Sequence, residues 1–295
     1  MSEPKPIFDS ALLTQRRNRA AAGADAHDFL LARAADDIAE RIGIVQRTFP
    51  LALDFGSHHG LLGRRIAELP SVGQVVSYDA AESLLARAAP PRVAGALDAL
   101  PFRDGAFDLV VSGLILHLID DLPGALIQIR RALKPDGLFM ASLLGGQTLR
   151  ELRDAWLQAE VELTGGASPR VAPFADVRDL GGLLQRAGFA LPVADSDVVT
   201  VTYRDPFALM REVKGMGASN MLLERRRVPV TRSLLLRAAA IYAERYGGAD
   251  GRVTATFEIL TLTAWAPHES QQQPLKPGSA KTRLADVLGV PERKL

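Results

Sequence analysis

The sequence contains no cysteine among its 295 residues. That absence excludes disulfide bonds, thiol nucleophiles, cysteine-ligated zinc and iron–sulfur clusters. It also fits a reducing compartment. An excess of one charge is lacking as well, since 35 basic residues face 34 acidic ones. Because nucleic-acid-binding domains usually carry a clear basic excess, no nucleic-acid partner is expected.

Long apolar runs are also missing, and a membrane-spanning helix needs about 20 apolar residues. The longest apolar stretch, residues 109–119, is interrupted by Ser112, Gly113 and His117, and it suits a buried strand. The N-terminal segment is polar and lacks the apolar core of a signal peptide. We therefore expect a cytoplasmic protein without a membrane span.

Lysine is scarce, with six among the 35 basic residues, so the remainder are arginine. A GC-rich genome explains such a bias. Alternatively, some arginines recognise carboxylates or phosphates through their forked guanidinium group. What the sequence does contain is typical of a globular protein, with 47% hydrophobic and 23% charged residues. This composition excludes a wholly disordered chain, a collagen and a coiled coil.

Strand and helix signals alternate through the first 145 residues. Short apolar strands are predicted at residues 50–54, 74–78, 107–112 and 138–144. Helices are predicted between them, at residues 61–69, 82–89 and 122–133. This alternation predicts an α/β fold with a doubly wound, mostly parallel sheet.

Five segments are expected along the chain. They are an N-terminal helix (1–26), a cofactor-binding core (27–145), a helical lid insertion with a core strand near 191–202 (146–250), a final strand (251–266) and a polar, flexible tail (267–295). The last two strands are expected to pair antiparallel.

The first predicted strand runs into a glycine-rich turn, residues 54–60, with the sequence DFGSHHG. In a doubly wound sheet, ligands bind beyond the carboxyl ends of the strands. Glycine lets the backbone approach such a ligand closely. The second strand ends at Asp79, where a carboxylate can accept hydrogen bonds from a ribose diol. An ordinary tight turn is the alternative interpretation.

The turn favours S-adenosylmethionine over NAD. A dinucleotide site needs Gly-x-Gly-x-x-Gly, whereas Ser57 and His58 follow Gly56 here. An acid two residues before that glycine, Asp54, suits the amino end of S-adenosylmethionine. The expected cofactor-binding residues in and around this turn are Asp54, Gly56, Ser57, His58, Gly60, Asp79, Ala80 and, at the end of the fourth strand, Ser112.

Three further segments resemble class I S-adenosylmethionine-dependent methyltransferases. They are residues 97–102 (LDALPF), 105–112 (GAFDLVVS) and 134–137 (KPDG), and they occur in the family's order. The resemblance implies a Rossmann-like sheet with a final antiparallel strand and S-adenosylmethionine as the cofactor.

The same resemblance places the adenine near Asp98, Ala99 and Leu100. Two positions depart from the family's pattern. His58 replaces the middle glycine of the turn, and Ala96 stands where many relatives carry an acid. Modest cofactor affinity is therefore expected.

Segments along nearly the whole chain resemble a narrower family. They include residues 8–9, 16–21, 116–117, 121–123, 143–153, 187–189, 215–220, 256–259 and 268–271. Together they are similar to bacterial members of the family of the mitochondrial complex I assembly factor 5, which are themselves similar to the malonyl-carrier-protein methyltransferase of biotin synthesis. The resemblance implies a role in complex I assembly with a complex I subunit as partner. For the mitochondrial member it also implies arginine hydroxylation.

Methyl transfer needs little acid–base help, because the sulfonium is already activated and orientation carries much of the rate. His117, just after the fourth strand, is the candidate general base, with a packed histidine as the alternative. His58 and His59 predict no metal site, because adjacent side chains in one turn point in different directions. No convincing two-histidine-one-carboxylate spacing supports an oxygen-activating centre.

Two arginine clusters and one glycine-containing segment each leave two interpretations open. By analogy with related folds, Arg16, Arg17 and Arg19 lie on a helix over the cofactor site; a solvated face is the alternative. The run Arg225–Arg227 is an exposed loop or an anion site. Residues 215–220 form a substrate-facing loop or a glycine-capped helix end.

The leading functional hypothesis is a methyltransferase-like protein that binds S-adenosylmethionine and modifies or chaperones a complex I subunit. One alternative is a methyltransferase of a small acid or a carrier-bound acyl group. A second is a non-catalytic assembly chaperone, and the least supported is a nicotinamide dehydrogenase. The substrate and the oligomeric state are not predicted.

Overall fold

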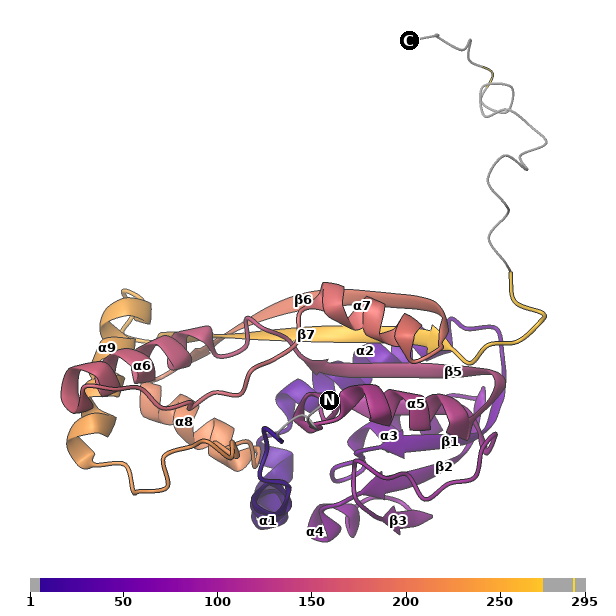
Figure 1. Ribbon diagram of the computed structural model, residues 1–295, viewed down its shortest axis with the longest axis horizontal. Coiled ribbons are helices and arrows are strands. Elements are labelled where there is room, and N and C mark those ends of the chain that lie inside the picture. The colour runs from indigo at the N-terminus through magenta and orange to yellow at the C-terminus, as the bar shows by residue number, and fades with distance from the viewer. Residues whose placement is uncertain (1–5, 273–288, 290–295) are drawn as a thin grey trace, which may run out of the picture.

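A seven-stranded sheet forms the centre of the computed structural model, which describes residues 6–272 and 289 (Figure 1). Its order is β3-β2-β1-β4-β5-β7-β6. The strands are β1 (Phe49–Phe55), β2 (Val72–Asp79), β3 (Arg92–Ala94), β4 (Phe107–Gly113), β5 (Leu133–Leu144), β6 (Ala190–Tyr203) and β7 (Val253–Trp265). Strands β1 to β5 run parallel, and β7 runs antiparallel to β5 and β6. The predicted doubly wound sheet with a final antiparallel pair is confirmed.

Helices connect the strands, and three of them, α6, α8 and α9, lie beyond one end of the sheet (Figure 1). They are α1 (Ser10–Ala20), η1 (Ala21–Ala26), α2 (Phe29–Gly43), α3 (Leu61–Ala67), α4 (Glu82–Leu85), η2 (Leu116–Leu118), α5 (Leu122–Ala132), α6 (Arg150–Thr164), α7 (Val177–Arg186), α8 (Pro206–Gly215) and α9 (Arg232–Tyr246). Several begin at a capping side chain that accepts a backbone N–H, as Asp121, Asp205 and Thr231 do for α5, α8 and α9.

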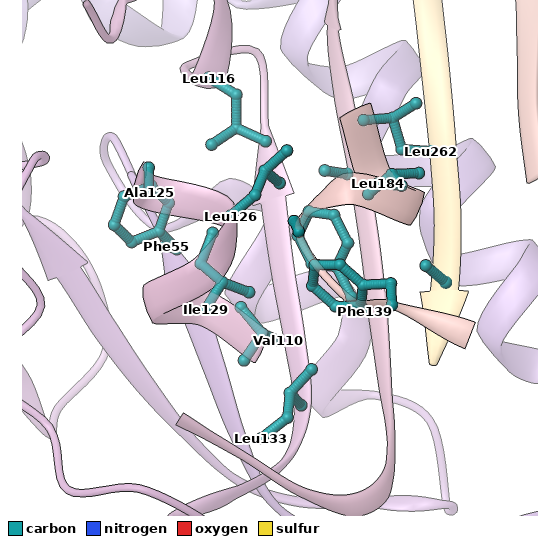
Figure 2. Close-up of a cluster of buried hydrophobic side chains, with 14 of the residues drawn as sticks. Phe55, Val110, Leu116, Ala125, Leu126, Ile129, Leu133, Phe139, Leu184 and Leu262 are labelled. Carbon is teal, nitrogen blue, oxygen red and sulfur yellow. The ribbon is translucent and has the colours of Figure 1, made fainter. Parts of the chain in front are cut away.

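Apolar side chains fill both faces of the sheet, because alternate strand residues point to opposite sides. On one face, Val110 and Phe139 belong to a buried cluster that includes Leu126 of α5 and Leu184 of α7 (Figure 2). On the other face, Leu109 packs in a cluster with residues of α2 and α3. Helices on both faces hold the carboxyl ends of β1, β2 and β4 in place.

Helices α6, α8 and α9, called the lid helices below, lie at the end of the sheet where β5 finishes (Figure 1). They pack around Trp156, Tyr242 and Phe257, in a buried cluster distinct from the sheet cores. The Tyr242 hydroxyl donates to the Thr254 carbonyl at 2.6 Å, which ties α9 to β7. The boundaries expected for the lid and the other segments remain predictions.

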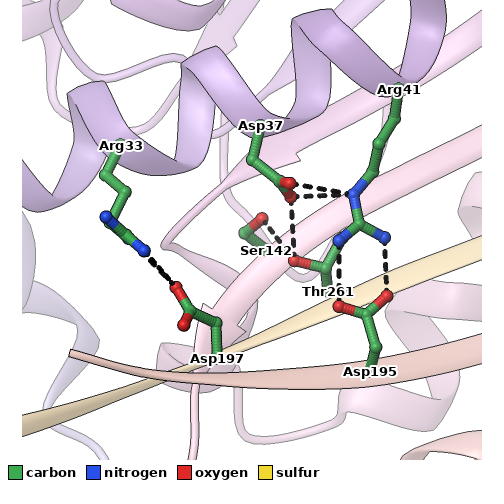
Figure 3. A network of polar contacts seen from close by, with 7 residues as sticks. All are labelled: Arg33, Asp37, Arg41, Ser142, Asp195, Asp197 and Thr261. Carbon is green, nitrogen blue, oxygen red and sulfur yellow. Dashed lines mark hydrogen bonds and ion pairs between the residues drawn. The ribbon is translucent and has the colours of Figure 1, made fainter.

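Polar contacts attach α2 to the last two strands (Figure 3). Arg33 pairs with Asp197 at 2.7 Å, and Arg41 pairs with Asp195 at 2.6 Å. Asp37 accepts from Arg41 on the same helix and from Thr261 of β7. Residues near the start of the chain therefore hold strands that are formed near its end.

Most predicted strands and helices agree with the structure to within two residues at each end, and two differ by four or more. Strand β5 begins at Leu133 rather than at residue 138, because Leu133 pairs with Phe107 before the register shifts. Helix α4 stops at Leu85 instead of residue 89, since its continuation makes tighter i→i−3 hydrogen bonds, such as Arg87 to Leu84.

The predicted flexible tail, residues 267–295, lies mostly outside the described residues. Within them, Gln271 donates to the Asp136 side chain and to the Ala266 carbonyl. Across the described part of the chain, no helix combines the length and apolarity that crossing a membrane requires.

Candidate functional site

In the glycine-rich turn between β1 and α3, three residues have a left-handed backbone conformation. Gly56 has φ +71° and Gly60 has φ +81°, while the intervening His58 has φ 51°. A Cβ on Gly56 would lie 2.2 Å from the Ile115 side chain, and one on Gly60 would lie 2.7 Å from the Ala88 backbone. Glycine is therefore required at both positions, because other residues disfavour a positive φ and because a Cβ atom would clash with its neighbours.

Three buried oxygen atoms around this turn have no hydrogen-bond partner among the described residues. They are Asp54 Oδ1, Ser57 Oγ and Ser112 Oγ. The other Asp54 oxygen accepts the Gly63 N–H at 2.9 Å. Burial raises the pKa of Asp54 to about 7. The Asp54 carboxylate is thus buried with a single hydrogen-bond donor, which is too little to stabilise its negative charge.

We expect Asp54→Asn to stabilise the protein more at pH 8 than at pH 5. In the folded state the Asp54 pKa lies near 7, above its ordinary value of 3.8. The wild-type carboxyl therefore costs stability above pH 7 and loses this cost as the pH falls toward 4. The amide has no such dependence. Urea unfolding of both proteins at the two pH values measures their difference in free energy of unfolding. An equal difference at both pH values would contradict a raised Asp54 pKa. Exposed Asp98→Asn is the control.

Asp79, at the end of β2, forms a buried bidentate ion pair with Arg17 of α1. Arg17 Nη1 and Nη2 lie 2.8 Å from Asp79 Oδ1 and Oδ2. The Ala81 and His58 backbone N–H groups donate to the same oxygens, at 2.7 and 2.9 Å. Burial alone would raise the Asp79 pKa, but Arg17 holds it below its usual value. Each carboxylate oxygen accepts two hydrogen bonds.

The His58 ring fills the space beside this ion pair. Its Nε2–H donates to the Gly113 carbonyl at 2.9 Å, so Nδ1 is the atom that accepts from Arg17 Nη2 at 3.1 Å. Burial, with Arg17 nearby, lowers the His58 pKa to about 3. A neutral imidazole therefore stands where the family pattern has a glycine.

This arrangement does not accommodate S-adenosylmethionine while Arg17 contacts Asp79. The Asp79 oxygens already have four donors, which leaves none free for ribose hydroxyls. The cavity lined by Arg17 and His58 has a volume of about 100 Å³, whereas small-molecule sites measure about 300–1,000 Å³. The unpartnered Asp54 and Ser57 oxygens fit a polar ligand, but Arg17 has to leave first.

The segment predicted to contact adenine, residues 98–100, lies beside β2. Side chains of neighbouring elements hold it through hydrogen bonds to its backbone. Gln128 of α5 donates to the Asp98 carbonyl at 2.8 Å and accepts from the Leu100 N–H at 3.0 Å. Tyr78 donates to the Ala99 carbonyl at 3.0 Å. Ala80, half-buried, directly follows Asp79. The adenine role of this segment and the cofactor role of Ala80 remain predictions.

His117, on η2, lines the small cavity and also a larger one. Its Nδ1 accepts the Leu144 N–H at 3.3 Å, and its ring lies 5.5 Å from that of Phe174. Burial lowers its pKa to about 3. Such a histidine is neutral at pH 7 but is a weak base. Its predicted catalytic role stays a prediction.

His59 points away from His58, as expected for neighbours in one turn. Its Nε2 lies 3.1 Å from Asp28 and 3.6 Å from Asp25. Asp25, Asp28 and His59 are close enough together to be considered as metal ligands, since their ligand atoms lie within 4.8 Å of one another. However, Arg87 already donates to Asp25 at 2.5 Å. That cation opposes a further positive charge.

The larger cavity, about 670 Å³, is lined by residues of α1 and of two lid helices, α6 and α8. Its walls include Trp156 of α6, Met210 of α8, Phe257 of β7 and the segment 225–230. The residues of α6 and β7 in this wall belong to no motif that predicts a binding role. The pairing of Arg17 with Asp79 is likewise not predictable from the sequence, because no local pattern signals a contact across 62 positions.

Comparisons with known proteins agree with this architecture. A family model described as a methyltransferase domain matches residues 53–141, from β1 to within β5. The YcgJ protein of Bacillus subtilis shares the fold, with a TM-score of 0.55 and 12% identity over 79% of this chain and 98% of its own.

A longer match comes from sequence relatives. The mitochondrial arginine-hydroxylase NDUFAF5 of Danio rerio is 40% identical over 287 residues, which cover 95% of this chain and 89% of that protein. The chain belongs to the NDUFAF5 family. The malonyl-[acyl-carrier protein] O-methyltransferase of Halorhodospira halophila is 36% identical over 88% of both chains. The match to NDUFAF5 thus extends well beyond the methyltransferase domain, into the lid helices.

Proposed function

We propose that this protein acts in the assembly of respiratory complex I, as a methyltransferase-like protein that binds S-adenosylmethionine and modifies or chaperones one subunit. The observation that carries the proposal is the 40% identity to NDUFAF5 over 95% of the chain. Since that match covers 95% of the chain, it includes the lid helices as well as the methyltransferase domain. A subunit partner and a place in the cytoplasm belong to the same proposal.

Methyl transfer to an acid or a carrier-bound acyl group is the second candidate. The malonyl-[acyl-carrier protein] O-methyltransferase relative supports it, with 36% identity over 88% of the chain. A chaperone without turnover is the third candidate, because Asp79 is occupied by Arg17 in this structure. Cofactor binding in any of these candidates requires Arg17 to release Asp79.

Deleting the gene in its host is expected to lower the amount of assembled complex I while growth without biotin continues. Native gels and NADH oxidation by isolated membranes measure assembly. Wild-type protein supplied in trans should restore it. A strain that needs biotin and keeps normal complex I would contradict the proposal and favour the carrier-bound substrate.

An Asp79→Asn variant separates the modifying protein from the chaperone. The comparison is made in an Arg17→Met background, where no guanidinium competes for Asp79. There, loss of the charged hydrogen-bond acceptor should weaken S-adenosylmethionine binding in calorimetry by about 1.5–3 kcal/mol. If the variant folds and loses binding yet still restores complex I, the chaperone candidate holds. Unchanged affinity would show that Asp79 is not the ribose partner. Exposed Asp104→Asn is the matched control.

A further inference from the structure

The larger cavity carries charge of one sign. Among the described residues that line it, every charged side chain is an arginine. These are Arg16, Arg170, Arg225, Arg226 and Arg227. Within the described part of the chain, this wall contains no aspartate, glutamate or lysine. Since the whole chain has nearly equal numbers of basic and acidic residues, this segregation is local to the cavity.

Two of the five arginines are neutralised by carboxylates. Arg170 pairs with Glu160 and lies over the Trp156 ring at 4.5 Å. Arg225 pairs with Asp9 at 3.0 Å. Both pairs fix a guanidinium at the cavity wall without adding net charge.

The other three, Arg16, Arg226 and Arg227, form no ion pair with any residue that the structure describes. Arg16 is half-buried on α1, and it donates to the Asn220 carbonyl, a neutral acceptor. Burial and the neighbouring Arg225 cation lower the Arg16 pKa. The wall therefore holds uncompensated positive charge, which an anion would stabilise.

The rest of the wall is mainly apolar. It includes Leu152, Trp156, Phe174, Met210 and Val213, from α6, α8 and the segment before α7. The volume of about 670 Å³ falls within the range of about 300–1,000 Å³ that small-molecule sites occupy. Apolar surface favours an apolar ligand body, and guanidinium forks favour an oxyanion.

We propose that this cavity binds an amphipathic anion, an apolar chain or ring that ends in a carboxylate or phosphate group. The anionic group meets Arg16, with Arg226 and Arg227 at the rim, and the apolar body lies against Trp156 and its neighbours. The inference concerns a binding site and does not depend on cofactor binding at Asp79 or on a role in complex I.

Tryptophan fluorescence can locate the ligand. The chain has two tryptophans, of which Trp156 lines the cavity and Trp265 ends β7 beneath Arg47. In a Trp265→Phe background, decanoate brominated at its tail should quench Trp156 saturably. Unbrominated decanoate and decyl phosphate should compete, and their relative strengths distinguish a carboxylate from a phosphate source. Decyltrimethylammonium should not compete.

Paired variants test the role of the arginines. Arg16→Gln should raise the half-saturating concentration about tenfold or more, as expected for loss of a charged hydrogen bond. Arg226→Gln removes an exposed charge at the rim and should raise it about two- to fivefold. Arg19→Gln removes the same charge from the exposed side of α1, outside both cavities, and should change it less than about twofold. Circular dichroism and thermal unfolding show whether each variant is folded.

Three results would overturn the inference. The first is equal quenching in the folded Arg16→Gln, Arg226→Gln and Arg19→Gln variants. The second is competition by decyltrimethylammonium as strong as that by decanoate. The third is an acidic peptide that binds through these arginines while decanoate does not, which would indicate a protein-docking surface. None of these outcomes bears on complex I assembly in the deletion strain.

Discussion

Replacing Arg17 with methionine is expected to lower the free energy of unfolding by about 3–5 kcal/mol, the usual cost of removing one partner of a buried ion pair. Asp79 would keep only the Ala81 and His58 backbone donors, in a site with no exposure to solvent. Urea unfolding at pH 7, with thermal unfolding alongside, measures the loss.

The double variant Arg17→Met with Asp79→Asn should recover most of that loss, because neither charge remains buried. Arg19→Met, on the exposed side of the same helix, should change stability by less than about 0.5 kcal/mol. The Asp79 pKa is lowered in the folded protein. Its stabilising contribution is therefore present above pH 3.8 and lost as the pH falls further, so the single-variant penalty should shrink in acid. A double variant whose loss equals the sum of both single losses would contradict the pairing.

Replacing Phe139 with alanine is expected to cost about 3–5 kcal/mol, the range for emptying a buried aromatic site. Phe139 has no exposed surface, and its ring stacks on Phe189 with centroids 5.2 Å apart. Leu126 and Leu184 belong to the same cluster, between α5, α7 and the sheet (Figure 2). The vacated volume lies under α7, so that helix should loosen first.

Hydrogen exchange of the α7 amides, together with urea unfolding, measures both effects. Phe139→Leu keeps most of the volume and should cost markedly less. Ile127→Ala, on the outer face of α5 with 40% of its surface exposed, is the surface control. A loss below about 1 kcal/mol for Phe139→Ala would mean that the cluster repacks, contrary to the density expected of this core.

The parallel sheet could be predicted because its strands are short apolar runs bounded by turns. Residues 50–54 and 107–112 fall within β1 and β4, and 138–144 fall within β5. The first four residues of β5 include Lys134 and Asp136, which look like turn residues. These residues join the strand because Leu133 pairs with Phe107 on β4. That pairing is a tertiary contact, which the local sequence does not indicate.

The candidate site was predicted less completely than the fold. Asp54, His58 and Asp79 lie close together at the carboxyl edge, since β1 and β2 are parallel neighbours, while their role toward a cofactor stays a prediction. What the sequence could not show is that Arg17 occupies Asp79. Local patterns report on neighbours along a helix or strand, whereas this contact joins α1 to β2 through packing alone.

The strand order also affects how the chain is completed during synthesis. Strand β7 lies between β5 and β6, yet it is the last of the three to be made. Until residue 265 has left the ribosome, β5 has an open edge of unpaired backbone groups and β6 has no strand beside it. Open edges of apolar strands are where nascent chains associate wrongly. Any truncation before β7 should therefore yield an aggregating fragment rather than a smaller folded protein.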